Sequence, residues 1–74
     1  MSETFETLIN DNQRKIQNIA FSYADQNERE DLIQDILVQL WRSHEQFKGD
    51  SASTTWLYRV ALNTAISYQR KKIS

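Results

Sequence analysis

The chain has 74 residues, a net charge of -1 and 39% apolar residues, with one glycine, no proline and no cysteine. This length allows one small domain, because domains usually contain about 100 to 150 residues. The lack of cysteine excludes disulfides, thiol catalysis and thiolate metal sites. A lone histidine, His44, does not suffice for a zinc site, so we expect neither a metal nor another cofactor.

No segment approaches the run of about 18 apolar residues that a membrane span requires, and the N-terminus is acidic where a signal peptide would be basic. We therefore expect a cytoplasmic protein. The near absence of glycine and proline also removes glycine-rich phosphate loops and argues against tight hairpins. These features predict an all-α fold.

The charges are unevenly distributed along the chain. Residues 1–53 carry ten acidic and five basic side chains, whereas residues 54–74 carry four basic side chains and no acidic one. Basic residues near a helix end can simply complement its dipole, or they can bind a polyanion. The charge distribution alone does not decide between these two interpretations.

The spacing of the apolar residues predicts a compact bundle of about three main helices, at roughly 4–24, 28–44 and 54–72, in a single domain spanning 1–74. In the first helix, apolar residues from Phe5 to Tyr23 repeat at intervals of three and four, with Asn12 at the one missed turn. The nine-residue connection at 45–53 is long for so small a domain. Because long loops often carry function, we expect a functional loop there.

The second helix has more apolar residues than a core stripe needs. The stripe itself consists of Leu32, Ile33, Ile36, Leu37 and Leu40. An adjoining strip of acidic, amide and apolar residues consists of Asp31, Gln34, Asp35, Val38 and Trp41. Either other helices of a small bundle pack against this helix from two sides, or the strip is a docking surface for another helix.

The third helix also has two faces. Its core face consists of Leu57, Val60, Ala61, Thr64 and Tyr68, and its opposite face of Tyr58, Arg59, Leu62, Asn63, Ile66 and Arg70. Rings can stack on unpaired bases, Asn can bond a base edge and Arg neutralises phosphate, so the second face suits nucleic acid. Amphipathic helices with a basic end are common, however, and a merely solvated face explains the same residues.

Three blocks of sequence resemble a known family. They are EDLIQDILVQLWR at 30–42, FKGD at 47–50 and TWLYRVALNTA at 55–65, and the likeness extends from Phe5 to Lys72. Together they resemble region 2 of bacterial RNA polymerase sigma factors of the extracytoplasmic-function (ECF) group. The resemblance implies a helical, non-enzymatic domain that binds core RNA polymerase at the clamp coiled coil of its largest subunit. It also implies that the domain recognises and melts the promoter -10 element for transcription initiation.

The resemblance assigns polymerase binding to the strip at Asp31, Gln34, Asp35, Val38 and Trp41. It assigns contacts with the unpaired non-template strand to Phe47, Lys48, Gly49, Asp50, Ser51, Ser53, Thr54, Trp56, Tyr58, Arg59, Asn63, Arg70 and Lys71. The loop would cradle a base flipped out of the strand. Asn63 would face the upstream edge of the element, while Arg59, Arg70 and Lys71 would hold phosphates. Trp56 would either wedge at the melting junction or pack inside, and we favour packing.

Two features depart from the family pattern. Ser53 and Thr54 stand where many relatives have an aromatic residue, so we expect a shallower or differently selective pocket for the flipped base. The chain also ends at Ser74, without the second helical domain, region 4, that reads the -35 element in the family. The sequence is therefore either an excised domain or a naturally short protein.

Alternative functions belong to other classes. A small helical protein–protein interaction module would bind no DNA and leave the basic helix solvated. A helix-turn-helix is disfavoured, because its turn of about three or four residues is shorter than the loop here. An enzyme is not expected, since Asp31 and Asp35 have no His, Cys or glycine loop to complete a site. The resemblance implies one further partner, an anti-sigma protein covering the same surfaces.

Overall fold

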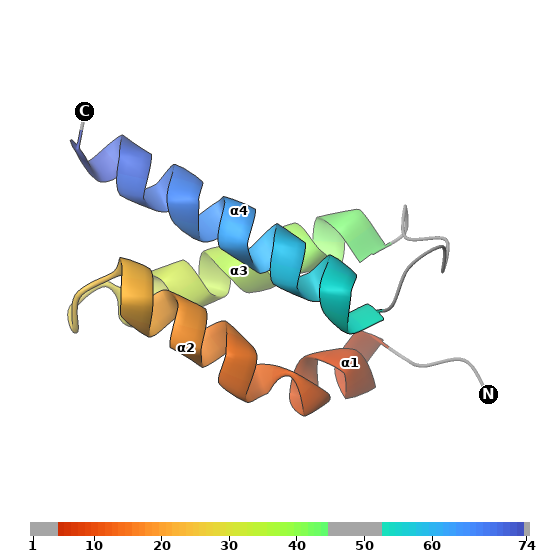
Figure 1. Cartoon of the computed structure of the whole chain (residues 1–74). Coiled ribbons are helices and arrows are strands. Elements are labelled where there is room, and N and C mark those ends of the chain that lie inside the picture. The colour runs from red at the N-terminus through yellow and green to blue at the C-terminus, as the bar shows by residue number, and fades with distance from the viewer. Residues whose placement is uncertain (1–4, 45–52, 74) are drawn as a thin grey trace.

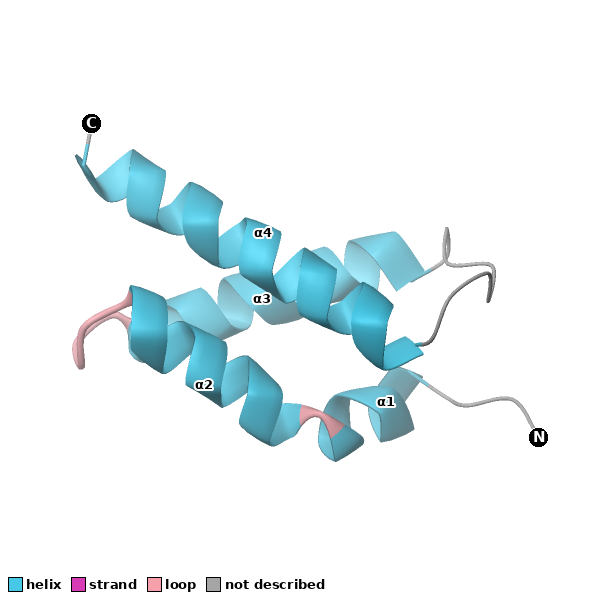
Figure 2. Ribbon diagram, viewed as in Figure 1, coloured by secondary structure: helices cyan, strands magenta, loops and turns pink. Residues whose placement is uncertain are grey.

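A computed structural model of the chain describes residues 5–44 and 53–73, and over these ranges it contains four α-helices and no strand. The helices are α1 (Phe5–Asp11), α2 (Gln13–Tyr23), α3 (Arg29–His44) and α4 (Ser53–Ile73). Figure 1 shows that α2 and α3 run antiparallel, as do α3 and α4. Short turns connect α1 to α2 and α2 to α3 (Figure 2). The predicted all-α fold is confirmed.

The prediction of one first helix at 4–24 is wrong, because the chain breaks there at Asn12 into α1 and α2. The backbone N–H of Asn12 donates to the carbonyl of Ile9 at 3.2 Å, three residues back rather than four. The side-chain Nδ2 of Asn12 donates to the carbonyl of Leu8 at 2.9 Å. The side chain thus takes the acceptor that the backbone N–H would use in a continuous α-helix, which explains the break.

The other two predicted helices lie close to their observed bounds. The helix predicted at 28–44 is α3, Arg29–His44, and the helix predicted at 54–72 is α4, Ser53–Ile73. Ser53, placed in the functional loop by the sequence, is the first residue of α4. The rest of the predicted loop, residues 45–52, lies outside the described residues.

One apolar core joins the four helices. Its buried members are Leu8, Ile16, Ile19, Ala20, Leu32, Ile36, Leu40, Leu57, Ala61 and Ala65. The three α3 residues of this core are fully inaccessible to solvent, and burying each such side chain stabilises the fold by about 1.5–3 kcal/mol. Small side chains at Ala20, Ala61 and Ala65 leave room for α2 and α4 to approach their neighbours closely. None of the helices over the described residues is both long enough and apolar enough to cross a membrane.

The break at Asn12 yields a stability prediction. Asn12 is 5% exposed, so Asn12→Ala leaves the Leu8 carbonyl without its side-chain partner in a buried place. We expect the free energy of unfolding to fall by about 1–2 kcal/mol in chemical denaturation. Asn10→Ala is the matched control, because Asn10 lies in α1 and is exposed. Equal effects of the two substitutions would show that the Asn12 hydrogen bond does not stabilise the break.

Candidate functional site

The outer face of α3 carries side chains that the core does not use. Its members are Asp31, Gln34, Asp35, Val38 and Trp41, which we call the α3 strip, and all five are exposed. Val38 is 50% exposed and Trp41 60% exposed, although both are large and apolar. Leu32, Ile36 and Leu40, on the core side of α3, are buried against α2 and α4, and the strip lies beside them, with Asp31 and Asp35 bordering α4. The strip is therefore a surface of mixed acidic and apolar character, which is typical of a docking face rather than of a core.

The indole of Trp41 lies in an aromatic cluster with Phe5 of α1 and His44 of α3. The ring centroids of Phe5 and Trp41 are 5.5 Å apart in an edge-to-face arrangement. The His44 ring centroid lies 4.9 Å from that of Trp41 and 4.8 Å from that of Phe5. The Nδ1 of His44 is 2.6 Å from the Trp41 carbonyl oxygen, and it donates because a carbonyl can only accept. These contacts hold the exposed indole in one orientation, as a preorganised binding anchor requires.

The hydroxyl of Tyr68, on α4, connects α4 to the first turn of α3 and to the residue just before it. It lies 3.0 Å from Oε2 of Glu28 and 3.3 Å from Oδ2 of Asp31, and it donates its one proton to these two carboxylates. Partial burial, the hydrogen bond and charge of Glu28, and then those of Asp31 raise the pKa of Tyr68 from 10.0 to about 12. The phenol is thus protonated at neutral pH and acts as a donor.

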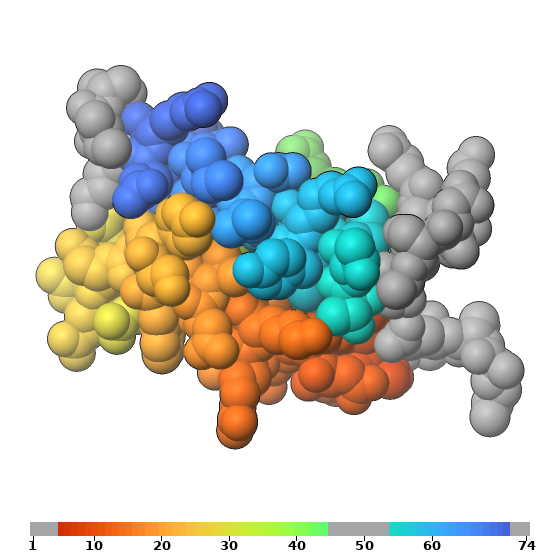
Figure 3. Space-filling view, viewed as in Figure 1, coloured from red at the N-terminus to blue at the C-terminus, as the bar shows by residue number. Residues whose placement is uncertain are grey.

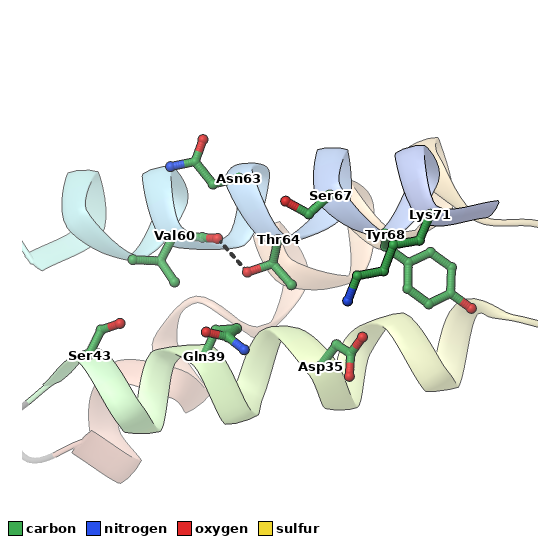
Figure 4. A pocket seen from close by; sticks show the side chains of 9 residues that line it. All are labelled: Asp35, Gln39, Ser43, Val60, Asn63, Thr64, Ser67, Tyr68 and Lys71. Atoms are coloured by element: carbon green, nitrogen blue, oxygen red, sulfur yellow. Dashed lines mark hydrogen bonds between the residues drawn. The ribbon is translucent and has the colours of Figure 1, made fainter. Parts of the chain in front are cut away.

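A polar groove of about 570 Å³ runs between α3 and α4 (Figure 4). Its lining residues are Asp35, Gln39, Ser43, Val60, Asn63, Thr64, Ser67, Tyr68 and Lys71. In Figure 4 the Lys71 side chain extends across the groove toward Asp35, whereas Asn63 points away from α3. A smaller hollow also places Lys71 beside Glu28, Asp35 and Tyr68. The predicted DNA-binding residue Lys71 therefore lies among acidic side chains of α3 and of the turn before it.

The outer face of α4 is exposed, basic and free of acidic side chains. Tyr58 is 48% exposed and Ile66 37% exposed, and Arg59, Asn63 and Arg70 are exposed between and beyond them. Trp56 is half-buried and packs against the core, which is the position that we favoured for it, and Thr54 is half-buried. The predicted loop contacts at Phe47, Lys48, Gly49, Asp50 and Ser51 lie outside the described residues.

A second groove, between α2 and α4, also lies beside this face. Its volume is about 420 Å³, and its lining residues are Lys15, Asn18, Ile19, Ser22, Tyr23, Tyr58 and Leu62. Figure 3 shows α2 and α4 side by side over this part of the molecule. Among the described residues no acidic one lines this groove, in contrast to the α3–α4 groove with its Asp35. The groove therefore brings Lys15 and Asn18 of α2 beside the α4 outer face.

The structure adds residues that sequence reasoning missed. Tyr68 was placed on the core face of its helix, yet its hydroxyl reaches two carboxylates. Lys15 and Asn18 show no sequence signal beyond their place on a polar helix face. Among the described residues, no group of three or more His, Asp or Glu side chains is arranged to hold a metal ion.

Comparisons with known proteins point to one family. The model of the family described as Sigma-70 region 2 matches residues 8–73. An ECF RNA polymerase sigma-E factor from Haemophilus influenzae is 38% identical over 66 residues, which make up 89% of this chain and 35% of that protein. The proteins of the same name from Escherichia coli K12 and Salmonella typhimurium are each 35% identical, with the same coverage of both chains. No solved structure matches significantly. The chain thus spans about a third of the length of these relatives.

The Tyr68 hydroxyl yields a prediction about alkaline pH. Because the folded protein keeps the phenol protonated above 10.0, its contribution to stability is complete below about pH 10 and is lost as the pH rises through about 12. Tyr68→Phe should remove a late ionisation step from the tyrosine absorbance titration and should flatten the fall of the unfolding free energy in this range. Tyr58→Phe, at an exposed ring, serves as the control. A wild-type titration in which all the tyrosines ionise with midpoints near pH 10 would contradict the prediction.

Proposed function

Because the chain belongs to the sigma-70 region 2 family, whose members are non-enzymatic transcription initiation factors, we propose that it binds core RNA polymerase and melts the promoter -10 element. This activity takes place in the cytoplasm, where the polymerase works. The observation that carries the proposal is the separation of two exposed faces: the acidic and apolar α3 strip, and the acid-free outer face of α4. The two faces suit partners of opposite chemistry.

The α3 strip is the proposed polymerase contact. Exposed Asp31 and Asp35 can form charge-assisted hydrogen bonds with basic side chains of a partner helix. Trp41, 60% exposed and held by its ring contacts, supplies an aromatic anchor of the kind that dominates binding energy at protein interfaces. The proposed partner element is the clamp coiled coil of the largest polymerase subunit, as the resemblance to the family implies, and a helical strip is compatible with docking against a helix.

The α4 outer face and the residues before it are the proposed DNA contact. Tyr58 offers an exposed ring for stacking on an unpaired base, and Arg59 and Arg70 offer cations for phosphates. Asn63 points away from α3 into solvent, where its amide can bond a base edge (Figure 4). The flipped base is proposed to bind the 47–54 segment, and Trp56 is proposed to support it from a half-buried place. Lys71 is also proposed to contact a phosphate, although it lines the same groove as Asp35.

The affinity for DNA is expected to depend on the polymerase. The basic side chains of one helix can neutralise only a few phosphates, and a -10 element exposes the edges of its nucleobases only when it is unpaired. Binding to core polymerase therefore supplies most of the affinity in this proposal. An anti-sigma protein that covers the α3 strip or the α4 outer face is the regulatory partner that we propose.

The proposed polymerase contact is tested by two substitutions with matched controls. We expect Trp41→Ala to weaken binding to bacterial core RNA polymerase by at least about 30-fold, as truncation of an interface anchor does. Asp35→Lys should also weaken it, because the reversed charge would repel a basic partner. Phe21→Ala and Asp11→Lys are the controls, since both residues are exposed on other helices. Binding can be followed by fluorescence anisotropy of the labelled chain.

Two outcomes would contradict this contact. Equal effects of the control substitutions would mean that the strip has no special role. A folded wild-type chain that does not bind core polymerase would overturn the proposed function and favour a module that binds other proteins only.

The proposed DNA contact is tested by charge reversal. Arg59→Glu should weaken the binding of single-stranded DNA of randomised sequence to the complex of this chain with core polymerase. It should also lower the slope of log affinity against log salt by about 0.7 for each phosphate that the protein no longer neutralises. Arg14→Glu makes the same charge change on the exposed side of α2, away from both grooves. Identical affinities and salt slopes in the two variants would remove Arg59 from the DNA contact.

A further inference from the structure

The Tyr68 contact with Asp31 joins the core-facing side of α4 to the α3 strip. We propose that Tyr68 is a positioning residue for polymerase binding, whose hydroxyl on α4 holds the Asp31 carboxylate of the α3 strip in the orientation that the partner binds. This inference rests on the proposed polymerase contact. It adds a residue that does not belong to the strip and lies 37 positions away from Asp31 in the sequence.

The packing of the Tyr68 side chain suits it to this role. The ring is half-buried and packs against the apolar core, so the place of the hydroxyl is fixed by α4 rather than by solvent. The hydroxyl also donates to Glu28 at 3.0 Å, so its one proton is shared between a carboxylate just before α3 and that of Asp31. Few rotatable bonds separate a phenol oxygen from the backbone, and packing of the ring against the core restricts rotation about them.

The contact orders the carboxylate of Asp31, which is otherwise exposed to solvent. A free surface side chain must be ordered when a partner binds, and ordering it beforehand improves the affinity by about two- to tenfold. The Tyr68 hydroxyl contacts Oδ2 of Asp31 only, at 3.3 Å. Because a carboxylate has about four lone-pair sites, Oδ1 and part of Oδ2 are available to the partner. A neutral donor also leaves the negative charge of Asp31 in place, which a Lys or Arg in the same position would offset.

The effect should be specific to one position of the strip. Gln34 is one turn further along α3, is exposed, and has no hydrogen bond to the Tyr68 hydroxyl. Removing the hydroxyl should therefore change the contribution of Asp31 to binding and leave that of Gln34 unchanged. A purely structural role of Tyr68 would instead lower stability and weaken all strip contacts alike.

The test is a pair of double-mutant cycles on core polymerase binding, in which Tyr68→Phe is combined with Asp31→Ala and, as the matched control, with Gln34→Ala. We expect Tyr68→Phe alone to weaken binding about three- to tenfold, with the ring packing kept. In the Asp31→Ala background the same substitution should have no further effect, whereas with Gln34→Ala the two effects should multiply. The free energy of unfolding of each variant is measured in parallel, to separate binding from stability.

Each outcome bears on the proposal. Wild-type affinity in Tyr68→Phe, or effects that multiply with Asp31→Ala, would overturn the positioning role while leaving polymerase binding intact. If wild-type chain fails to bind, the proposed function and this role fall together. If Tyr68→Phe does not fold, Asp31→Ala and Asp31→Asn are measured instead. Affinities of both variants equal to that of wild type would also overturn the positioning role, because Asp31 would then contribute nothing to binding.

Discussion

The α3 strip depends on how α3 is held in the core. Leu32, Ile36 and Leu40 are completely buried between α2 and α4, and they recur at intervals of four residues along one side of α3. This packing fixes the rotation of α3 about its axis. The α3 strip is exposed as a consequence, because its members lie to one side of the buried stripe, whereas Ile33 and Leu37 on the other side of it pack against the core. A change in this packing would move every member of the strip together.

The break at Asn12 also supports the α3 strip, at the end of α3 that carries Trp41. Because the chain leaves the axis of α2 at this residue, α1 runs in a different direction from α2 (Figure 1). Phe5 then reaches the last turn of α3, where it contacts the rings of Trp41 and His44. At the opposite end of α3, Tyr68 holds Asp31. Both ends of the α3 strip are thus supported by other helices, α1 at one end and α4 at the other.

The sequence predicted the parts of the fold that depend on periodicity alone. The bounds of α3 and α4 and the buried positions Leu32, Ile36 and Leu40 follow from spacings of three and four residues, whereas the spacing left open whether Val38 and Trp41 are covered or exposed. The break at Asn12 could not be read in this way, because the apolar spacing resumes in the same phase after this one missed turn, and the interruption comes from a side-chain hydrogen bond.

Features that join distant segments were also beyond the sequence. The Tyr68 contact with Asp31 and the two interhelical grooves depend on the antiparallel register of α3 and α4 and on the closeness of α2 to α4. Periodicity fixes the faces of one helix, but it carries no information on which turn of a neighbour lies opposite. Lys71 illustrates this limit, since its place beside Asp35 and Glu28 follows from the register and not from its basic neighbours in the sequence.

The central claim is that α3 and α4 present two separate faces to two different partners. It is tested most directly by mapping amide chemical shifts of the isotope-labelled chain during titration with a fragment of the clamp coiled coil of the polymerase. We predict that the shifts cluster at Asp31, Gln34, Asp35, Val38 and Trp41, with the outer face of α4 unchanged. Shifts along Tyr58, Arg59 and Arg70 with none on the α3 strip would contradict the claim.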